Sequence, residues 1–262
     1  MTSALDLSIP ISLPAEKKIY FASDFHLGAP NFQRSKEREK TIVQWLESIR
    51  PDAYGMFLLG DIFDFWFEYR RVVPKGFLHL QGKLIQLLEQ GIFVVFFTGN
   101  HDLWMFDYFE RELSIPIIRQ PISIQINQTK LHIGHGDGLG PHDYTYKRIK
   151  RVFVSKIGQK LFSLIHPDIG IFLANSWSRS SRRSNEKKDE SFRGKEYEWI
   201  YQYCQEVEQK QHHDYYVFGH RHLPLQIPLS ERSRYYNLGE WITQPHYGIF
   251  DGQTFELRAF QA

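Results

Sequence analysis

The sequence lacks several features that would identify a disulfide-bonded, zinc-binding, membrane-spanning or secreted protein. Of its 262 residues only Cys204 is a cysteine, which excludes an internal disulfide and a zinc site built on cysteines. We expect Cys204 to be a half-buried side chain on a helix. No stretch holds the roughly 18 uninterrupted apolar residues of a membrane span, and the first residues lack the charged start and apolar run of a secretion signal. A cytoplasmic location is therefore expected.

Net charge is also small, at +2, and by itself predicts no polyanionic partner. The charges are unevenly distributed, however. Residues 147–195 hold 13 Lys and Arg against 4 Asp and Glu, a net of +9, so the rest of the chain has 19 against 26, a net of −7. An acidic body would repel a long phosphate backbone, so we expect no nucleic-acid partner.

What the sequence does hold is an alternation of short β-like runs with helical stretches. The helical stretches are residues 35–49 and 74–91, the second closed by Gly91 as a C-cap. Residues 116–135 are typical of an antiparallel hairpin, and residues 234–260 are rich in strand formers. Alternation of this kind predicts an α/β fold whose sheets are mixed rather than purely parallel.

Over residues 144–195 or so, the pattern changes to helical segments that Gly158, Pro167 and Gly170 are expected to break. A further helix is expected to follow it. We interpret this stretch as a helical insertion in a single domain that spans residues 1–262.

Polar residues follow most of the strand-like runs directly. They are Asp24 and His26 in SDFHLG, Asp61 in GDIFD, Asn100, His101 and Asp102 in GNHD, His135 in HGDG, and His220 and His222 in GHRH. Residues past the carboxyl ends of strands in an α/β sheet converge on one crevice, and a glycine beside each ligand permits a sharp turn and a close approach. Carboxylates and imidazoles without a thiolate suit Mn, Fe or Zn. So many ligands indicate two ions that share a bridging carboxylate, about 3.5–4 Å apart.

Each motif alone has an ordinary structural interpretation, because Asp and Asn beside glycine are common turn residues. Histidine is also common in this chain. Other histidines receive no role, among them His79, His132, His166, His212, His213 and His246. Five such motifs in succession, each at a strand end, are far less frequent by chance and favour a metal site.

The order Asp-x-His, Gly-Asp, Gly-Asn-His-Asp, Gly-His and Gly-His-x-His resembles the signature of the calcineurin-like metallophosphoesterases over nearly the whole chain. The resemblance implies a four-layer αββα sandwich with two divalent ions at one sheet edge, with Mn expected and Fe, Zn or Mg as alternatives. It assigns Asp24, His26 and His222 to the first ion, Asn100, His135 and His220 to the second, and Asp61 to the bridge. His101 then lies near the leaving group as a general acid or charge stabiliser, and Asp102 orients it.

The chemistry of such a centre supports a hydrolase. Two cations acidify a water held between them, so that it attacks phosphorus in line as hydroxide near neutral pH. The ions and His101 would neutralise the charge that grows on the phosphoryl oxygens. We therefore expect hydrolysis of a phosphoester or phosphoanhydride without a covalent enzyme intermediate.

Three stretches resemble the members of this family that cleave the pyrophosphate of UDP-2,3-diacylglucosamine, giving UMP and 2,3-diacylglucosamine 1-phosphate in lipid A synthesis. They are GDIFDFWF, ANSWSRSSRRSN in the helical insertion, and LGEWITQPHYGIFDGQTFEL. The resemblance implies that the substrate is bound by Asn100, His101, Asp143, Ser176, Ser180, Arg183 and His220. The chain departs from those members at His101, where they have Arg, and at Ser180 and Arg183, where they have Asn and Lys. Arg183 keeps a cation that can clamp a phosphate with two hydrogen bonds.

The helical insertion also carries apolar residues interleaved with cations. The apolar residues are Val152, Phe153, Ile157, Leu161, Phe162, Leu164, Ile165, Ile169, Ile171, Phe172 and Leu173. Packing against the sandwich would explain any one of them, but it does not require the basic excess. Basic amphipathic helices favour anionic membrane surfaces. We expect peripheral contact with the cytoplasmic face of the inner membrane, and a lipid-nucleotide substrate.

Two other functions stay open at the level of the sequence. One is a phosphodiesterase or phosphatase for a soluble nucleotide, with the insertion acting only as a lid. The other is a non-catalytic binding module at a membrane. The intact set of ligands argues against that module, because binding alone does not need all of them. No obligate protein partner is indicated.

Overall fold

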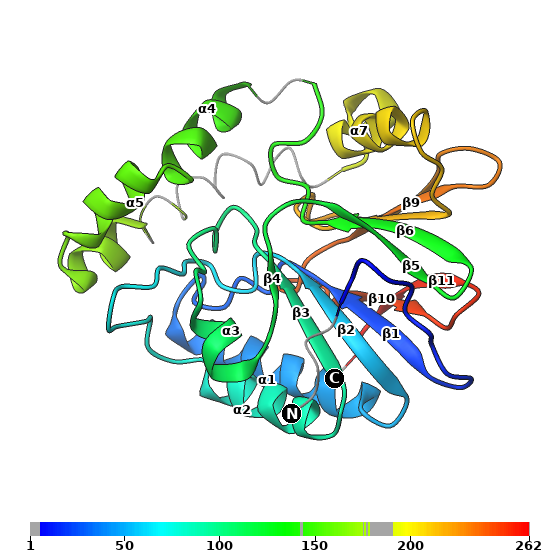
Figure 1. The fold of residues 1–262 in the computed structure, drawn as a ribbon. Coiled ribbons are helices and arrows are strands. Elements are labelled where there is room, and N and C mark those ends of the chain that lie inside the picture. Colours follow the sequence, from blue (N-terminus) through cyan, green and yellow to red (C-terminus); the bar gives the residue numbers. More distant parts are fainter. Residues whose placement is uncertain (1–5, 142–143, 175, 177, 179–190, 262) are drawn as a thin grey trace.

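The computed structural model describes residues 6–141, 144–174, 176, 178 and 191–261, and these form two β-sheets with helices on their outer faces (Figure 1). The six-stranded sheet has the order β11 (Phe255–Ala259), β10 (His246–Phe250), β1 (Lys18–Ala22), β2 (Ala53–Leu59), β3 (Phe93–Phe97) and β4 (Ile117–Ile118). The five-stranded sheet has the order β5 (Ile122–Ile126), β6 (Thr129–Gly134), β7 (Tyr215–Phe218), β9 (Arg234–Leu238) and β8 (Pro224–Pro228).

Both sheets are mixed, as predicted. In the first, β1 to β4 pair in parallel, while β10 and β11 are antiparallel. In the second, β6, β7 and β9 are parallel and have antiparallel neighbours in β5 and β8. The parallel strands of each sheet end at a common edge, and this edge is where the predicted ligands follow them.

The helices are α1 (Phe32–Ile49), α2 (Leu78–Glu89), α3 (Tyr108–Leu113), α4 (Tyr144–Phe153), α5 (Lys156–Ser163) and α7 (Trp199–Glu208), with a 3₁₀ turn η1 (Lys195–Tyr197). Helix α1 begins earlier than predicted, because the Asn31 side chain caps it by accepting a hydrogen bond from the Arg34 N–H. Helix α2 ends at Glu89, and Gly91 follows with φ of 80°, as expected for a residue that ends a helix.

Three hydrophobic clusters hold four layers together. Alternate residues of β1 face opposite ways, so that Phe21 lies between the two sheets and Tyr20 lies under the helices. The cluster between the first sheet and its helices includes Trp45 of α1. On the far side, the second sheet packs against α7 through Cys204, which is fully buried rather than half-buried as expected. The predicted αββα sandwich is confirmed.

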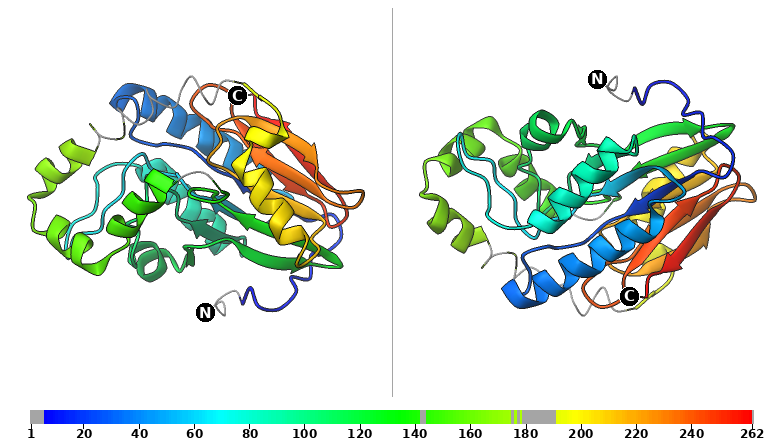
Figure 2. Two further views of the ribbon diagram at one scale, coloured as in Figure 1. Left: turned by 90° about the horizontal axis from the view of Figure 1, so that it is seen from above. Right: turned by 90° about the horizontal axis from the view of Figure 1, so that it is seen from below.

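Helices α4 and α5 fall within the predicted helical insertion and lie to one side of the two sheets (Figures 1 and 2). A break is observed directly before Pro167, where residues 164–166 are not helical, but the two glycines do not break their helices. Gly158 lies inside α5, whose N-cap is Ser155. Gly170 lies inside a further helical stretch, and Pro167 is its first helical residue. None of the described helices combines the length and the apolar character that are needed to cross a bilayer.

Candidate metal centre

The predicted ligands come together where the parallel strands end. One group consists of Asp24, His26, Asp61 and His222, and a second of Asp61, His135 and His220; within each group the candidate ligand atoms lie within 4.8 Å of one another. Asp61 belongs to both groups, which is the position that the predicted bridge requires. The assignment of particular residues to particular ions stays a prediction.

Short distances connect the members of each group. The Nε2 atom of His222 lies 3.0 Å from Nε2 of His26 and 3.2 Å from Oδ1 of Asp24. In the second group, Nε2 of His135 lies 3.4 Å from Oδ2 of Asp61 and 3.3 Å from Oδ1 of Asn100. Asn100 therefore lies with the residues to which the sequence had assigned it.

The chemistry of these atoms fits divalent cations. Oδ1 of Asp24 and Oδ2 of Asp61 are buried and accept no hydrogen bond from the described part of the chain, which is costly for a carboxylate without a cation. Nδ1 of His135 donates to the Leu59 carbonyl at 2.8 Å, so Nε2, 3.4 Å from Oδ2 of Asp61, is the ring nitrogen that can bind a cation once it has lost its proton. Buried oxygens and ring nitrogens that converge in this way form a set of ligands for two such ions.

The pKa values of these groups agree with that interpretation. Burial opposes the charged form of His135, but the carboxylates of Asp61, Asp24 and Asp137 together raise its pKa to about 10. Burial likewise disfavours the Asp61 carboxylate, yet the imidazoles around it hold its pKa well below the usual range. In the protein without metal a proton thus neutralises part of the site, and metal binding would release that proton.

The backbone at the centre is strained in a consistent way. Five of the predicted ligands have φ in the left-handed region: Asp24, His26, Asp61, His220 and His222, with values from 44° to 69°. Such residues cost free energy and cluster at functional sites. Gly60 has φ of 91°, and a Cβ there would lie 2.7 Å from Nδ1 of His135, so glycine is needed for the turn and for the close approach.

Asp102 was predicted to orient His101, but its carboxylate binds backbone N–H groups instead. Its carboxylate accepts backbone N–H groups from Gly99 (2.7 Å), Ile62 (2.8 Å), Asp61 (3.3 Å) and Phe63 (3.3 Å). Burial and the nearby Asp61 carboxylate raise the pKa of Asp102 to about 7. Asp102 therefore fixes the loops after β2 and β3 relative to each other and does not hold the His101 ring.

The His101 ring is held instead by Asp64 and Ser178. Its Nδ1 lies 3.0 Å from the Asp64 carbonyl oxygen and 3.0 Å from the Ser178 hydroxyl. Burial lowers the pKa of His101 to about 4, although the Asp61 charge opposes this shift. Neither partner was predicted from the sequence. The second aspartate of the GDIFD motif was the available signal for Asp64, and nothing local indicated Ser178.

The residues predicted to bind substrate within the insertion are only partly described. Ser176 is exposed, and its hydroxyl donates to the Phe172 carbonyl of its own helix at 2.8 Å. Asp143, Ser180 and Arg183 lie outside the described residues. Their roles stay predictions.

The helical insertion packs directly on the loops that carry the ligands. The Phe162 ring of α5 lies 4.7 Å from the ring of Trp104 and 4.8 Å from that of Phe67, between ring centroids. On α4, Lys150 forms an ion pair of 2.6 Å with the buried Asp137, two residues after His135. Contacts therefore join both helices to the surroundings of the metal centre.

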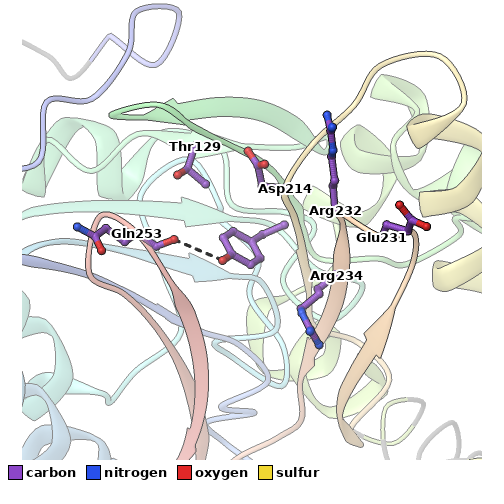
Figure 3. A pocket seen from close by; sticks show the side chains of 7 residues that line it. Thr129, Asp214, Glu231, Arg232, Arg234 and Gln253 are labelled. Atoms are coloured by element: carbon purple, nitrogen blue, oxygen red, sulfur yellow. Dashed lines mark hydrogen bonds between the residues drawn. The ribbon is translucent and has the colours of Figure 1, made fainter.

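A shallow cavity of about 150 Å³ lies elsewhere, at the start of β6, β7 and β9 (Figure 3). It is lined by Thr129, Asp214, Tyr215, Glu231, Arg232, Arg234 and Gln253. Since the ligands follow the opposite ends of the parallel strands, this cavity does not belong to the metal centre.

Comparison with known proteins agrees with the fold and the centre. Residues 17–224 match the pattern of the calcineurin-like phosphoesterase family, so the chain belongs to that family. It is a metal-dependent hydrolase, and its candidate metal ligands include the two groups described above; a third such group, His26, Asp64 and His101, shares His26 with the first.

Particular relatives are similar over nearly their whole length. A UDP-2,3-diacylglucosamine hydrolase of Porphyromonas gingivalis is 34% identical over 260 residues, which is 93% of this chain and 98% of the relative. A protein of the same name from Vibrio atlanticus is 28% identical over 92% of this chain and 96% of its own. Among solved structures, an archaeal phosphodiesterase aligns with a TM-score of 0.45 and 13% identity over 93% of this chain and 99% of its own.

Proposed function

We propose that the protein hydrolyses the pyrophosphate of UDP-2,3-diacylglucosamine, giving UMP and 2,3-diacylglucosamine 1-phosphate. The observation that carries this proposal is an exposed apolar helical face beside a metal centre suited to phosphoesters. On the insertion, Ile157 is 74% exposed, Leu161 62% and Leu164 76%. A diphosphate at the centre with acyl chains toward the insertion would use both features. The names of the relatives, which say that they hydrolyse this compound, support the same substrate.

The residues of this chain would bind the diphosphate and exclude water. His101 is half-buried and neutral near pH 7, because desolvation lowers its pKa to about 4. Its ring lies 4.9 Å from the ring of His26, a member of the first group, and is proposed to contact a phosphoryl oxygen or the leaving group there. Asn100 and His220 are proposed to contact the phosphates from the other group.

The proposed cofactors are two divalent ions, with Mn first and Fe, Zn or Mg as alternatives. Asp24, His26 and His222 would hold one ion, Asn100, His135 and His220 the other, and Asp61 both. When bound, these ions would supply Lewis-acid chemistry at the phosphorus.

We also propose that the insertion contacts the anionic cytoplasmic face of the inner membrane. Lys156 and Lys160 lie on the same short helix as the exposed Ile157 and Leu161. A helix that combines apolar and cationic side chains gains both from burial of its apolar face and from attraction to anionic lipids. An acylated substrate is found at such a surface.

The test is a comparison of three substrates with the Mn-loaded protein. Release of UMP would be followed by chromatography for UDP-2,3-diacylglucosamine and UDP-N-acetylglucosamine, and release of nitrophenol for bis(p-nitrophenyl) phosphate. We expect kcat/KM to be at least about 100-fold higher for the diacylated nucleotide than for the unacylated one, since acyl burial contributes several kcal/mol. Equal turnover of the two UDP-sugars would refute the proposal and favour a soluble nucleotide.

Two controls complete this experiment. Protein stripped with a chelator should lose turnover of every substrate and regain it with Mn, while a His222→Ala variant should not regain it. Loading in parallel with Fe, Zn and Mg, with bound metal counted by mass spectrometry, tests the proposed order of metals. Absence of turnover with every metal would favour a non-catalytic binding module.

A further inference from the structure

A hydroxyl of the helical insertion reaches the metal centre. Ser178 is buried, with 5% of its surface exposed, whereas Phe172, nearby on the same insertion, is 65% exposed. Its Oγ lies 3.0 Å from Oδ2 of Asp64, which is 114 residues away in the chain, and 3.0 Å from Nδ1 of His101, which is 77 residues away. The insertion thus contributes a polar contact to the centre as well as apolar surface.

The direction of these hydrogen bonds follows from the chemistry of the groups. A carboxylate only accepts, so the Ser178 O–H donates to Asp64, and its oxygen is left to accept from the Nδ1–H of His101. The Asp64 carbonyl, 3.0 Å from the same Nδ1, is a second acceptor. Two acceptors around Nδ1 fix the proton there, which leaves Nε2 as the ring nitrogen that can contact a phosphate.

We infer that Ser178 is a positioning residue for His101, and that through it His101 is held in its working orientation only while the helical insertion is packed on the sandwich. This inference rests on the proposed hydrolysis at the centre. If the insertion moved away, His101 would lose one of the two acceptors at Nδ1, and the ring would gain rotational freedom. Binding of substrate under the insertion would thereby be coupled to the group that acts on its phosphate.

Ser178 has a simpler alternative role, which is to hold the insertion in place through Asp64 alone. The two roles predict different kinetics. A residue that acts through His101 affects kcat for every substrate and leaves KM nearly unchanged, whereas a residue that only anchors the insertion affects KM for an acylated substrate.

The test is a double-mutant cycle on the full-length, Mn-loaded protein, with Ser178→Ala, His101→Ala and the double variant. We expect Ser178→Ala to lower kcat about 10-fold, with KM changed less than about twofold. In the His101→Ala background, the same change should have no further effect on kcat. Ser178→Thr, which keeps the hydroxyl, should restore most of the activity. Ser163→Ala is the matched control, because its hydroxyl is exposed and donates to the Lys160 carbonyl of its own helix. Independent, multiplicative losses in the cycle would overturn the inference.

The cycle is run on UDP-2,3-diacylglucosamine and on bis(p-nitrophenyl) phosphate, so that the inference and the proposed function can fail separately. Turnover of the aryl ester alone would refute the substrate, while the cycle would still decide the role of Ser178. A readout without turnover is the long-range ¹H–¹⁵N spectrum of histidine-labelled, zinc-loaded protein. Ser178→Ala should shift the His101 Nδ1 signal, and an unchanged signal would count against the inference whatever the kinetics.

Discussion

The indole Nε1 of Trp104 donates a hydrogen bond of 2.8 Å to the carbonyl of Phe153, and this joins the loop after Asn100 and His101 to the end of α4. The Phe162 ring of α5 packs on the same indole. The helical insertion is thus attached to the segment that carries three of the predicted site residues, Asn100, His101 and Asp102. A shift of the helical insertion would therefore be transmitted through Trp104 to the loop that carries Asn100 and His101.

Phe162→Ala should loosen the insertion without unfolding the sandwich. Phe162 is half-buried, so the loss should be below the ~3–5 kcal/mol of a fully buried phenylalanine, and we expect about 1–2 kcal/mol. Hydrogen exchange should become faster in α4 and α5 and stay unchanged in β1 to β3. Phe172→Ala, at a 65% exposed position of the same insertion, is the control. Unchanged exchange in α4 and α5 would contradict the prediction.

Asp61→Asn should abolish turnover, because this carboxylate belongs to both groups of ligands. We expect kcat/KM to fall at least about 100-fold and the bound metal to fall below two ions per chain, as counted by mass spectrometry. Asp107→Asn, which changes a 59% exposed carboxylate paired with Arg111, serves as the control. A variant that kept two ions and full activity would show that Asp61 is not the bridge.

Arg183→Ala tests a predicted substrate residue that lies outside the described residues. If its guanidinium clamps a phosphate of the substrate, KM for the diacylated nucleotide should rise about 10-fold with little change in kcat, equivalent to about 1.4 kcal/mol. Arg34→Ala on α1, where the side chain is 73% exposed, should leave both constants unchanged. An unaltered KM in Arg183→Ala would remove this residue from the proposed site.

Membrane contact is tested by Leu161→Asp combined with Leu164→Asp. These side chains are 62% and 76% exposed on the insertion, and burial of each in a bilayer surface would contribute about 1.5–3 kcal/mol. Sedimentation with phosphatidylglycerol-containing vesicles should weaken at least 10-fold, by order of magnitude. Leu78→Asp, at a 73% exposed position of α2, should bind as the wild type does. Equal binding of all three proteins would exclude this face.

Acid should destabilise the protein through two histidines away from the centre. Burial lowers the pKa of His132 to about 4 and also lowers that of His213, whose ring lies 5.2 Å away. Because these values are below the ordinary value of about 6.5, the unfolded chain binds protons first. The contribution of these neutral histidines to the free energy of unfolding is fully present above about pH 6.5. It is lost as the pH falls toward about 4, the pKa of His132 in the folded protein.

His132→Gln removes one of these protonation steps. The free energy of unfolding, measured with urea at several pH values between 7 and 4.5, should fall less steeply in this variant, by up to about 1.4 kcal/mol per pH unit. Groups at the metal centre titrate in both proteins, so the difference between the two slopes isolates His132. Parallel slopes would show that its pKa in the folded protein is ordinary.

The elements of the fold could largely be predicted because their signals are local. A continuous apolar run such as that of β1, Ile19 to Ala22, predicts a strand with two buried faces, and it does so without knowledge of what covers them. Helix boundaries were less accurate, since a glycine inside a short helix is tolerated when its neighbours pack well, as at Gly158. The fully buried state of Cys204 depends on how α7 packs on the second sheet, which no local pattern records.

The sequence by itself determined which chemical groups lie at the centre, because Asp24, Asp61, Asn100, His135 and His220 each stand within three residues of the end of a strand and parallel strands end at one edge. Only the tertiary structure decided which partners hold His101. Asp102 is adjacent in the chain, yet its carboxylate is occupied by backbone N–H groups, and Asp64 and Ser178 contact the ring instead. Local spacing fixes where each ligand residue stands relative to the end of its strand. Contacts between residues 77 or 114 positions apart depend instead on how the insertion packs on the sandwich.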